Sequence, residues 1–305
     1  MINLSGVSKY FDQVTAVDEI SLQANEREIL VLLGPSGCGK TTTLKMINRL
    51  IEPDKGAITI NGEDIKRQKP EDLRRGIGFV MQHSGLFPHY SVEENIAVVP
   101  TLLNWDKKKI RSRTIELLEK LHLSAVLLSR LPQELSGGQQ QRVGIARALI
   151  VNTPILLMDE PFGALDNITK AEIHSEFKSL EELQNKTIII VTHDIQEAFE
   201  LGHRICLMDK GKIVQIGTPK EMLYHPVNDF VRDFFASNRL LLEHKIALIK
   251  DVFPLLSEGK FGNNIISADA SVWDTLQLLG SQNNDPESYD AISKAFNAYR
   301  KLHLS

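Results

Sequence analysis

The chain has 305 residues, of which 42% are hydrophobic, and its 35 Lys and Arg against 39 Asp and Glu give a formal net charge of −4. This slightly acidic balance excludes a protein built mainly to neutralise nucleic-acid phosphate, so no nucleic-acid partner is expected. Two cysteines in a chain of this length indicate a reducing compartment rather than a disulfide scaffold. At roughly one domain per 150 residues, the length predicts two structural units.

The hydrophobic segments of the chain are short. No apolar run approaches the ~18 residues that a membrane-spanning helix needs, because Pro100 and Asp159 interrupt the longest candidates. The first residues lack the basic lead and the long apolar core of a signal peptide. A role at a membrane is therefore expected only through partner subunits.

The pattern of apolar residues predicts an α/β core. Strands are expected at residues 4–7, 17–22, 29–33, 57–60 and 77–81, and a helix at 41–50. Between about residues 91 and 131, apolar residues recur at helix spacing among charges. Continuous apolar runs at 155–158 and 187–191 are typical of strands buried on both faces of a parallel sheet. We therefore expect a sheet with a helical insertion at about 85–150.

The strand expected at 29–33 runs into a glycine-rich segment. It reads Gly34-Pro35-Ser36-Gly37-Cys38-Gly39-Lys40-Thr41-Thr42, the full G-x-x-x-x-G-K-[ST] pattern of a phosphate-binding loop. The glycines let backbone N–H groups point inward at phosphates, and the next helix directs its positive end at the same anion. Lys40 can reach the β- and γ-phosphates, and the Thr41 hydroxyl can contact Mg²⁺. Cys38 is expected to be tolerated rather than catalytic. The segment predicts binding of a nucleoside triphosphate.

Two later strands also end in polar residues. Asp159 and Glu160 follow the run at 155–158, and His193 follows the run at 187–191. Asp159 is placed to hold Mg²⁺ through its water shell. Glu160 is placed as the general base that orients an attacking water. A catalytic edge of the sheet is therefore predicted.

A second anion site is expected at residues 135–139, which we call the signature segment. It reads Leu135-Ser136-Gly137-Gly138-Gln139 and precedes an apolar helical run, so it also forms a helix N-terminus. With this segment and the phosphate loop, the chain resembles the nucleotide-binding subunits of ABC transporters over residues 2–236. The resemblance implies an α/β phosphate-loop NTPase fold, with a mixed sheet core and a helical subdomain in a domain at 1–236. It also implies that two cassettes pack head to tail and bind ATP between them. The signature segment of each cassette would cap the nucleotide held by the phosphate loop of the other cassette.

The resemblance implies roles for further residues. His193 would contact the γ-phosphate as a switch, and Gln82 would link Mg²⁺ and water to the helical insertion. Asp166 would lie in the loop that crosses the dimer seam. Phe11 aligns best with the aromatic residue that stacks on adenine, and the neighbouring Tyr10 is its rival.

A single cassette without a fused membrane span resembles bacterial importers. Such a subunit would be peripheral on the cytoplasmic face of the membrane, with a second cassette, permease subunits and, indirectly, an extracytoplasmic binding protein as partners. Segments at 54–65, 82–100 and 225–241 look most like importers of glycine betaine, carnitine and choline. Leu86, Phe87 and Tyr90 would seat a short permease helix. An importer of another small solute and a non-transport ATP switch are the alternatives.

Residues 237–305 are expected to form a short α-rich extension. A strand, a Ser cap and a helix at 265–279 resemble the opening of a CBS module, and a second amphipathic helix is expected at 289–302. The roughly 68 residues after Ser237 are too few for a pair of such modules. Ligand sensing by this extension is therefore not expected.

Overall fold

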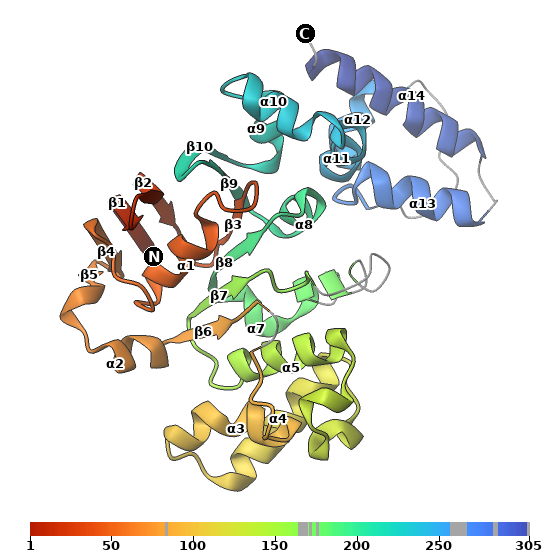
Figure 1. The fold of residues 1–305 in the computed structure, drawn as a ribbon. Helices are drawn as coiled ribbons and strands as arrows, with labels where there is room; N and C mark the ends of the chain where they lie inside the picture. The colour runs from red at the N-terminus through yellow and green to blue at the C-terminus, as the bar shows by residue number, and fades with distance from the viewer. Residues whose placement is uncertain are drawn as a thin grey trace. The chain divides into compact units, whose positions relative to one another are not determined.

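The computed structural model describes residues 1–82, 85–163, 170, 173–174, 177–256, 267–282 and 286–303. The chain divides into two compact units, Met1–Val214 and Gln215–Ser305, whose elements are labelled in Figure 1. The predicted boundary between residues 236 and 237 stays a prediction.

The first unit is built on a largely parallel sheet. Within the described residues this sheet has six strands, in the order β10-β9-β3-β8-β7-β6, and β9, β3, β8, β7 and β6 pair in parallel. Every residue of β7 and β8 is buried, which explains their continuous apolar sequences and confirms the prediction of strands covered on both faces. The strands are β3 (Ile29–Leu33), β6 (Ile77–Val80), β7 (Ile155–Asp159), β8 (Thr187–Thr192), β9 (Arg204–Asp209) and β10 (Lys212–Gly217), which continues past the end of this unit at Val214.

A second, antiparallel sheet lies in the same unit. Its order among the described residues is β2-β1-β4-β5, and the pairing of β1 with the edge strand β2 has several register shifts. The predicted strands at 4–7, 17–22 and 57–60 are confirmed as parts of this sheet. Its strands are β1 (Ile2–Phe11), β2 (Val14–Ala24), β4 (Lys55–Ile60) and β5 (Glu63–Asp64).

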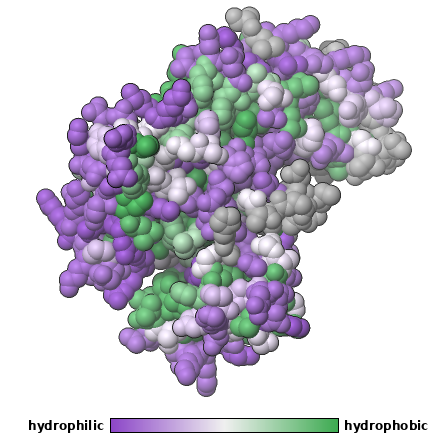
Figure 2. Space-filling model, viewed as in Figure 1, coloured by the Kyte–Doolittle hydropathy of each residue, from purple (hydrophilic) through white to green (hydrophobic). Residues whose placement is uncertain are grey.

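The helical insertion is confirmed as three helices that pack on one another. Helix α3 contacts both α4 and α5, and apolar residues gather on the face of the unit that carries α3 and α5 (Figure 2). Helix α3 begins at a capping box, in which the Ser91 hydroxyl accepts a hydrogen bond from the backbone N–H of Glu94 at 3.2 Å. The helices given by the described residues of the unit are α1 (Lys40–Ile47), α2 (Pro70–Arg75), α3 (Val92–Leu102), α4 (Lys107–Lys120), α5 (Gly137–Leu149), α7 (Glu181–Gln184) and α8 (Ile195–Leu201), with 3-10 turns η1 (Ile65–Arg67), η2 (Ala125–Ser129) and η3 (Pro132–Glu134).

The helix expected at 41–50 is shorter than predicted. Helix α1 ends at Ile47, and Arg49 has a left-handed backbone with φ of +48° that no helix can continue through. Within the described part of the chain, no helix combines the length and the hydropathy that crossing a bilayer requires.

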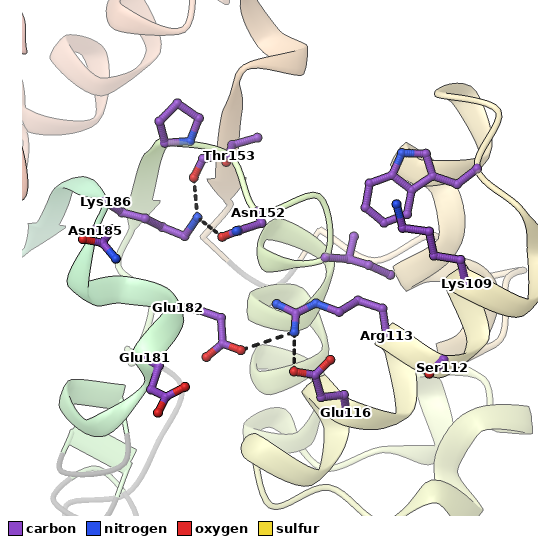
Figure 3. Close-up of a pocket in the computed structure, with 13 residues that line it drawn as sticks. Lys109, Ser112, Arg113, Glu116, Asn152, Thr153, Glu181, Glu182, Asn185 and Lys186 are labelled. Carbon is purple, nitrogen blue, oxygen red and sulfur yellow. Dashed lines mark hydrogen bonds and ion pairs between the residues drawn. The ribbon is translucent and has the colours of Figure 1, made fainter.

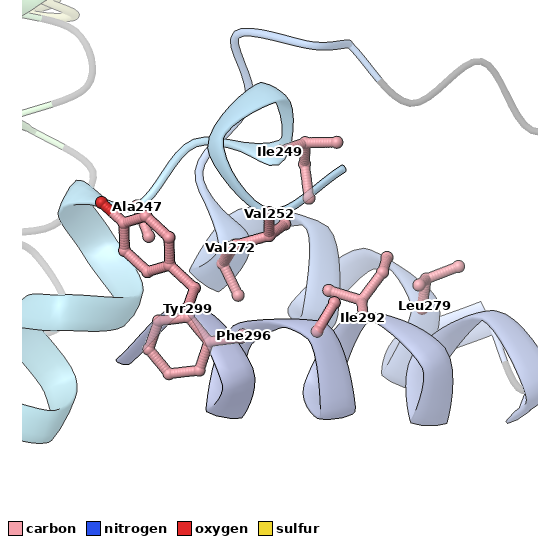
Figure 4. Packing of buried hydrophobic residues seen from close by; sticks show 9 residues of the cluster. Ala247, Ile249, Val252, Val272, Leu279, Ile292, Phe296 and Tyr299 are labelled. Atoms are coloured by element: carbon pink, nitrogen blue, oxygen red, sulfur yellow. The ribbon is translucent and has the colours of Figure 1, made fainter. Parts of the chain in front are cut away.

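The second unit is mainly helical and has its own apolar core. Figure 4 shows side chains of α12, α13 and α14 meeting in a cluster that includes Val252, Val272, Ile292 and Phe296, all 1% exposed or less. The two amphipathic helices predicted after residue 270 are confirmed as α13 and α14. The helices are α9 (Pro219–Tyr224), α10 (Asp229–Ala236), α11 (Arg239–Ile246), α12 (Ile249–Val252), α13 (Val272–Gln282) and α14 (Pro286–His303), with the 3-10 turn η4 (Phe253–Leu255).

The strand expected just before α13 is wrong over residues 267–270. These residues form a turn, closed by a 3.0 Å hydrogen bond from the N–H of Ala270 to the carbonyl of Ser267, because Ser and Asp side chains favour local turns. Ser271 makes an isolated bridge to Leu248 and caps α13, as predicted, by accepting from the N–H of Asp274 at 3.0 Å. Residues 265 and 266 lie outside the described residues, and the likeness to a CBS module stays a prediction.

Candidate active site

The phosphate loop joins β3 to α1 at the carboxyl edge of the parallel sheet. Lys40 is only 5% exposed, and its Nζ donates to the carbonyl oxygens of Gly34 at 2.8 Å and Pro35 at 2.9 Å. The ammonium group therefore lies in the hollow of the loop, where a phosphate contact would require it.

Close packing as well as a positive φ enforces two of the glycines in the loop. Gly34 has φ of +150°, and a Cβ there would lie 2.1 Å from the carbonyl oxygen of Met208. Gly39 has φ of +104°, and its Cβ would lie 2.5 Å from the carbonyl oxygen of Ala16. Cys38 between them is 3% exposed, and burial raises the pKa of its thiol. Burial and a raised pKa are typical of a packed thiol rather than of a nucleophile, and the expectation that Cys38 is tolerated rather than catalytic stays a prediction.

Two oxygen ligands suited to Mg²⁺ meet beside the loop. The Thr41 hydroxyl donates to Asp159 Oδ1 at 2.8 Å, and Asp159 ends β7 with 3% of its surface exposed. Burial raises the pKa of Asp159, whereas the hydrogen bond from Thr41 and the charge of Lys45 oppose that rise. Mg²⁺ in nucleotide sites takes one or two protein oxygens and completes its shell with phosphates and water. The donor set therefore fits this ion.

Glu160 lies at the junction of three strand ends. Gln82 Nε2, just beyond β6, donates to Glu160 Oε2 at 3.0 Å. His193 Nδ1, just beyond β8, is 3.1 Å from Glu160 Oε1. The order β6-β7-β8 makes these three residues neighbours, so the structure brings together the catalytic residues that the sequence analysis named.

The backbone of Glu160 has an unusual conformation. Its φ is +46°, in the left-handed region that residues with a Cβ seldom adopt. Its N–H donates to the carbonyl of Val191 at 2.9 Å, which fixes the turn after β7 to the end of β8. This strained turn directs the Glu160 side chain towards Gln82 and His193.

The signature segment begins helix α5. The Ser136 hydroxyl accepts from the N–H of Gln139 at 3.2 Å, and the Gln139 side chain accepts from the N–H of Ser136 at 3.0 Å. First-turn N–H groups have no partner within a helix, and here two of them belong to Gly137 and Gly138. Figure 1 places α5 with α3 and α4, away from α1, so the signature segment and the phosphate loop are separate sites of one chain.

Phe11 is the more accessible of the two candidate adenine-stacking residues. It ends β1 with 44% of its surface exposed, and the Lys9 Nζ lies 5.3 Å from its ring centroid. Tyr10 is partly buried, and its backbone N–H donates to Asp54 at 2.6 Å. Asp166 lies outside the described residues.

The loop at residues 85–90 presents two aromatic rings on the surface. Phe87 and Tyr90 are 48% and 45% exposed, with ring centroids 5.3 Å apart. Asn95, fully buried in α3, fixes this loop: it accepts from the N–H of Phe87 at 2.7 Å and donates to the carbonyl of Tyr90 at 2.9 Å. The sequence analysis gave Asn95 no role, since only its place on the buried face of α3 distinguishes it from a surface amide.

A separate pocket of about 890 Å³ lies at the opposite edge of the sheet (Figure 3). It is lined by Asn152 and Thr153, which precede β7, and by Lys186, which precedes β8. Lys186 Nζ donates to Asn152 Oδ1 at 2.8 Å, and burial lowers the pKa of Lys186 to about 8. Because the phosphate loop follows the carboxyl end of β3, which is parallel to β8, this pocket is distinct from the nucleotide site.

A phosphate loop, an acidic strand end and the histidine beside Glu160 thus share one edge of a parallel sheet, and this places the first unit among the phosphate-loop ATPases. A family model described as "ABC transporter" matches residues 17–163. The chain belongs to the ABC transporter family, as an ATP-hydrolysing cassette subunit, and the predicted family and fold are confirmed.

Two curated relatives from Bacillus subtilis (strain 168) are similar over most of this chain. The glycine betaine/carnitine/choline transport ATP-binding protein is 51% identical over 93% of this chain and 74% of its own length. The choline transport ATP-binding protein is 43% identical over the same shares. A dimeric structure of a post-hydrolysis state of an ATP-binding cassette, bound to ADP and Pi, has a TM-score of 0.65 and 35% identity, covering 72% of this chain and 98% of its own.

Proposed function

We propose that this chain is the ATPase subunit of an importer for a quaternary ammonium osmoprotectant of the glycine betaine, carnitine and choline class. The observation that carries the proposal is the extent of the likeness. A match over 93% of this chain includes most of the residues after 236, beyond the part that any ABC cassette would share. Both of these relatives are named for the transport of quaternary amines.

The phosphate loop is proposed to hold ATP with Mg²⁺. Lys40 would meet the β- and γ-phosphates, and the backbone N–H groups of the loop would surround them. Thr41 and Asp159, joined at 2.8 Å, would hold Mg²⁺ with Gln82 nearby. Mg²⁺ supplies neutralisation of the charge on the phosphate oxygens.

Hydrolysis is proposed to depend on Glu160 as the general base. Its carboxylate is oriented by Gln82 on one oxygen and by His193 on the other, which leaves it little freedom to rotate. A base held in this way can accept the proton of a water beside the γ-phosphate. His193, whose side chain is 58% exposed, would sense the γ-phosphate directly.

A second copy of the cassette is proposed to complete each nucleotide site. The signature segment is a helix N-terminus remote from the chain's own phosphate loop, so its N–H groups at Gly137 and Gly138 suit an anion from another molecule. A head-to-tail pair would bring each signature segment to the partner's γ-phosphate. The dimeric form of the similar cassette structure supports this arrangement.

The rings of Phe87 and Tyr90 are proposed to receive a permease helix. Aromatic residues on a loop held by a buried side chain form a preorganised apolar patch, which suits an interface core. This contact would hold the subunit at the cytoplasmic face of the membrane, and an extracytoplasmic binding protein would act through the permease.

Replacing Phe11 by Ala is expected to raise the KM for ATP about 5–150-fold with little change in kcat. Stacking of a base on an aromatic ring contributes ~1–3 kcal/mol, and Phe11 is exposed enough to be truncated without a core cavity. Steady-state ATP hydrolysis measures the effect, with Tyr10→Ala as the matched variant. A larger KM effect from Tyr10→Ala would assign the stacking role to Tyr10.

Uptake by cells tests the substrate class. Cells that lack this chain are complemented with the wild type or with Glu160→Gln, and uptake of labelled betaine, carnitine and choline is measured. We expect the wild type alone to restore uptake of at least one of the three. Restoration by the Glu160→Gln variant, or uptake of all three that does not depend on this chain, would contradict the proposal and favour another solute or a non-transport role.

A further inference from the structure

The pocket at the opposite edge of the sheet is formed by two parts of the first unit. Helix α4 of the helical insertion supplies Lys109, Arg113 and Glu116, while α7 and the residue before β8 supply Glu182 and Lys186. Figure 3 shows these two groups on facing sides of the pocket. Its volume of about 890 Å³ is that of a small-molecule site. The described residues that line it are all separate from the nucleotide site, so an occupant would be a second ligand.

Lys186 is a buried cation that lines this pocket. It is 3% exposed, and its Nζ donates to Asn152 Oδ1 at 2.8 Å and to the carbonyl oxygen of Thr153. Both acceptors are uncharged, and within the described residues Lys186 makes no ion pair. An ammonium group has three N–H donors, so one remains for a ligand. An anion in the pocket would balance a charge that is costly to bury alone.

Glu182 has an unpartnered oxygen in the same pocket. Its side chain is 6% exposed, and its Oε1 accepts from Arg113 at 3.4 Å and from Lys120. Among the described residues, its buried Oε2 has no hydrogen-bond partner. Burial alone would raise the pKa of Glu182, but the hydrogen bond from Lys120 and the charges of Lys120 and Arg113 hold that pKa below its usual range. Glu182 is therefore an ionised carboxylate with acceptor positions to spare.

The carboxylate of Glu182 lacks a donor rather than a cation. Arg113 and Lys120 also contact Glu116, at 2.5 Å and 2.9 Å, so two cations are shared by two carboxylates. Because the charge of Glu182 is already balanced, a neutral O–H group is the partner that satisfies it without a new charge. Rotation about the soft last torsion of the side chain can direct either oxygen at such a group.

The other charged side chains of the pocket leave a positive excess. Lys109 and Glu181 are both exposed, and the Lys109 Nζ lies 4.1 Å from the ring centroid of Trp105. Within the described part of the chain, neither Lys109 nor Glu181 makes an ion pair. The two cations Lys109 and Lys186 are thus opposed by one exposed carboxylate, and the pocket favours a ligand with negative charge.

We propose that this pocket binds a phosphate monoester that carries hydroxyl groups, with the phosphate at Lys186 and a hydroxyl donating to Glu182. Lysine commonly binds phosphate as a point charge, and Lys109 adds a second positive charge for a dianionic ligand. A bound molecule of this class would link α4 to the start of β8, beside the existing ion pair of Arg113 with Glu182. The site is independent of the function proposed above.

Two matched probes test the class of ligand. Calorimetric titration of the full chain compares glycerol 3-phosphate with propyl phosphate, which has the same carbon chain and phosphate but no hydroxyl. ADP and Mg²⁺ are present in excess, so that the phosphate loop does not take up the probes. Glycerol 3-phosphate is expected to bind with a Kd of about 1 mM or tighter. Propyl phosphate should bind ~10–100-fold more weakly, because Glu182 would again lack a donor.

Three substitutions test the place of binding. Lys186→Met keeps the length of the side chain but removes its charge, and it should weaken binding of glycerol 3-phosphate ~10–100-fold. Lys109→Ala should weaken it about 2–5-fold, as the loss of an exposed charge does. Lys107→Ala is the matched control, an exposed lysine of the same helix that does not line the pocket, and should bind like the wild type. Since Lys109 is exposed, its variant serves even if Lys186→Met does not fold.

Three results would overturn the inference. One is an absence of binding by glycerol 3-phosphate at concentrations up to about 10 mM. Another is binding that a folded Lys186→Met variant, or Lys109→Ala in its place, leaves unchanged. The third is equal affinity for the two probes, which would remove the hydroxyl contact with Glu182. Failure of the proposed transport function would leave all of these measurements unaffected, because none of them depends on ATP turnover or uptake.

Discussion

Replacing Glu160 by Gln is expected to lower the rate of ATP turnover by ~10²–10⁴-fold while leaving ATP binding intact. The amide has nearly the shape of the carboxylate but cannot accept the proton of the attacking water. Lys40 and Thr41 are the main residues proposed to hold the nucleotide. Within the described residues, neither makes a hydrogen bond to Glu160, so the substitution should leave the binding of ATP intact.

The same variant is expected to trap a dimer in the presence of ATP. If ATP joins two cassettes and hydrolysis releases them, a chain that binds but does not hydrolyse should accumulate as a pair. Size-exclusion chromatography with and without ATP measures the pair, and a phosphate-release assay measures turnover. Glu71→Gln, in the first turn of α2, is the matched control and should behave like the wild type.

Turnover by Glu160→Gln close to the wild-type rate would remove Glu160 from the role of general base. If the variant is inactive but stays monomeric with ATP, the role of Glu160 as general base would stand. The proposal that ATP joins two cassettes would then be contradicted. The two readouts therefore test the chemistry and the assembly separately.

Much of the catalytic edge could be predicted from the sequence because the strands that build it are continuous apolar runs. Asp159, Glu160 and His193 stand directly after such runs, so their place at the ends of β7 and β8 followed from the pattern alone. The contact between Gln82 and Glu160 could not be predicted from this pattern. It requires the lateral order β6-β7-β8, and local periodicity does not encode which distant strands pair.

The left-handed turn at Glu160 could not be predicted, because no glycine or asparagine marks it. It is imposed by a tertiary hydrogen bond to Val191. The turn at residues 267–270 was missed for a related reason. An apolar start suggested a strand, whereas the chain there closes a hydrogen-bonded turn at Ser267 and Ala270.

Gly34→Ala is expected to lower the free energy of unfolding by about 2–6 kcal/mol. Backbone in this region of φ costs a non-glycine residue ~1–3 kcal/mol, and forcing a methyl group into closed packing costs a similar amount. Here the added Cβ would lie 2.1 Å from the carbonyl oxygen of Met208, so the end of β9 or the phosphate loop must move. Chemical denaturation without nucleotide measures the loss.

Gly37→Ala separates the two causes of that loss. Gly37 lies in the same loop with φ of +80°, but a Cβ there would meet no atom within 4 Å. It should therefore suffer only the cost of the left-handed backbone, ~1–2 kcal/mol. Equal losses in the two variants would show that contact with Met208 does not enforce glycine at position 34. A larger loss for Gly34→Ala would show that β9 sets the shape of the phosphate loop from outside it, as the packing at Gly34 predicts.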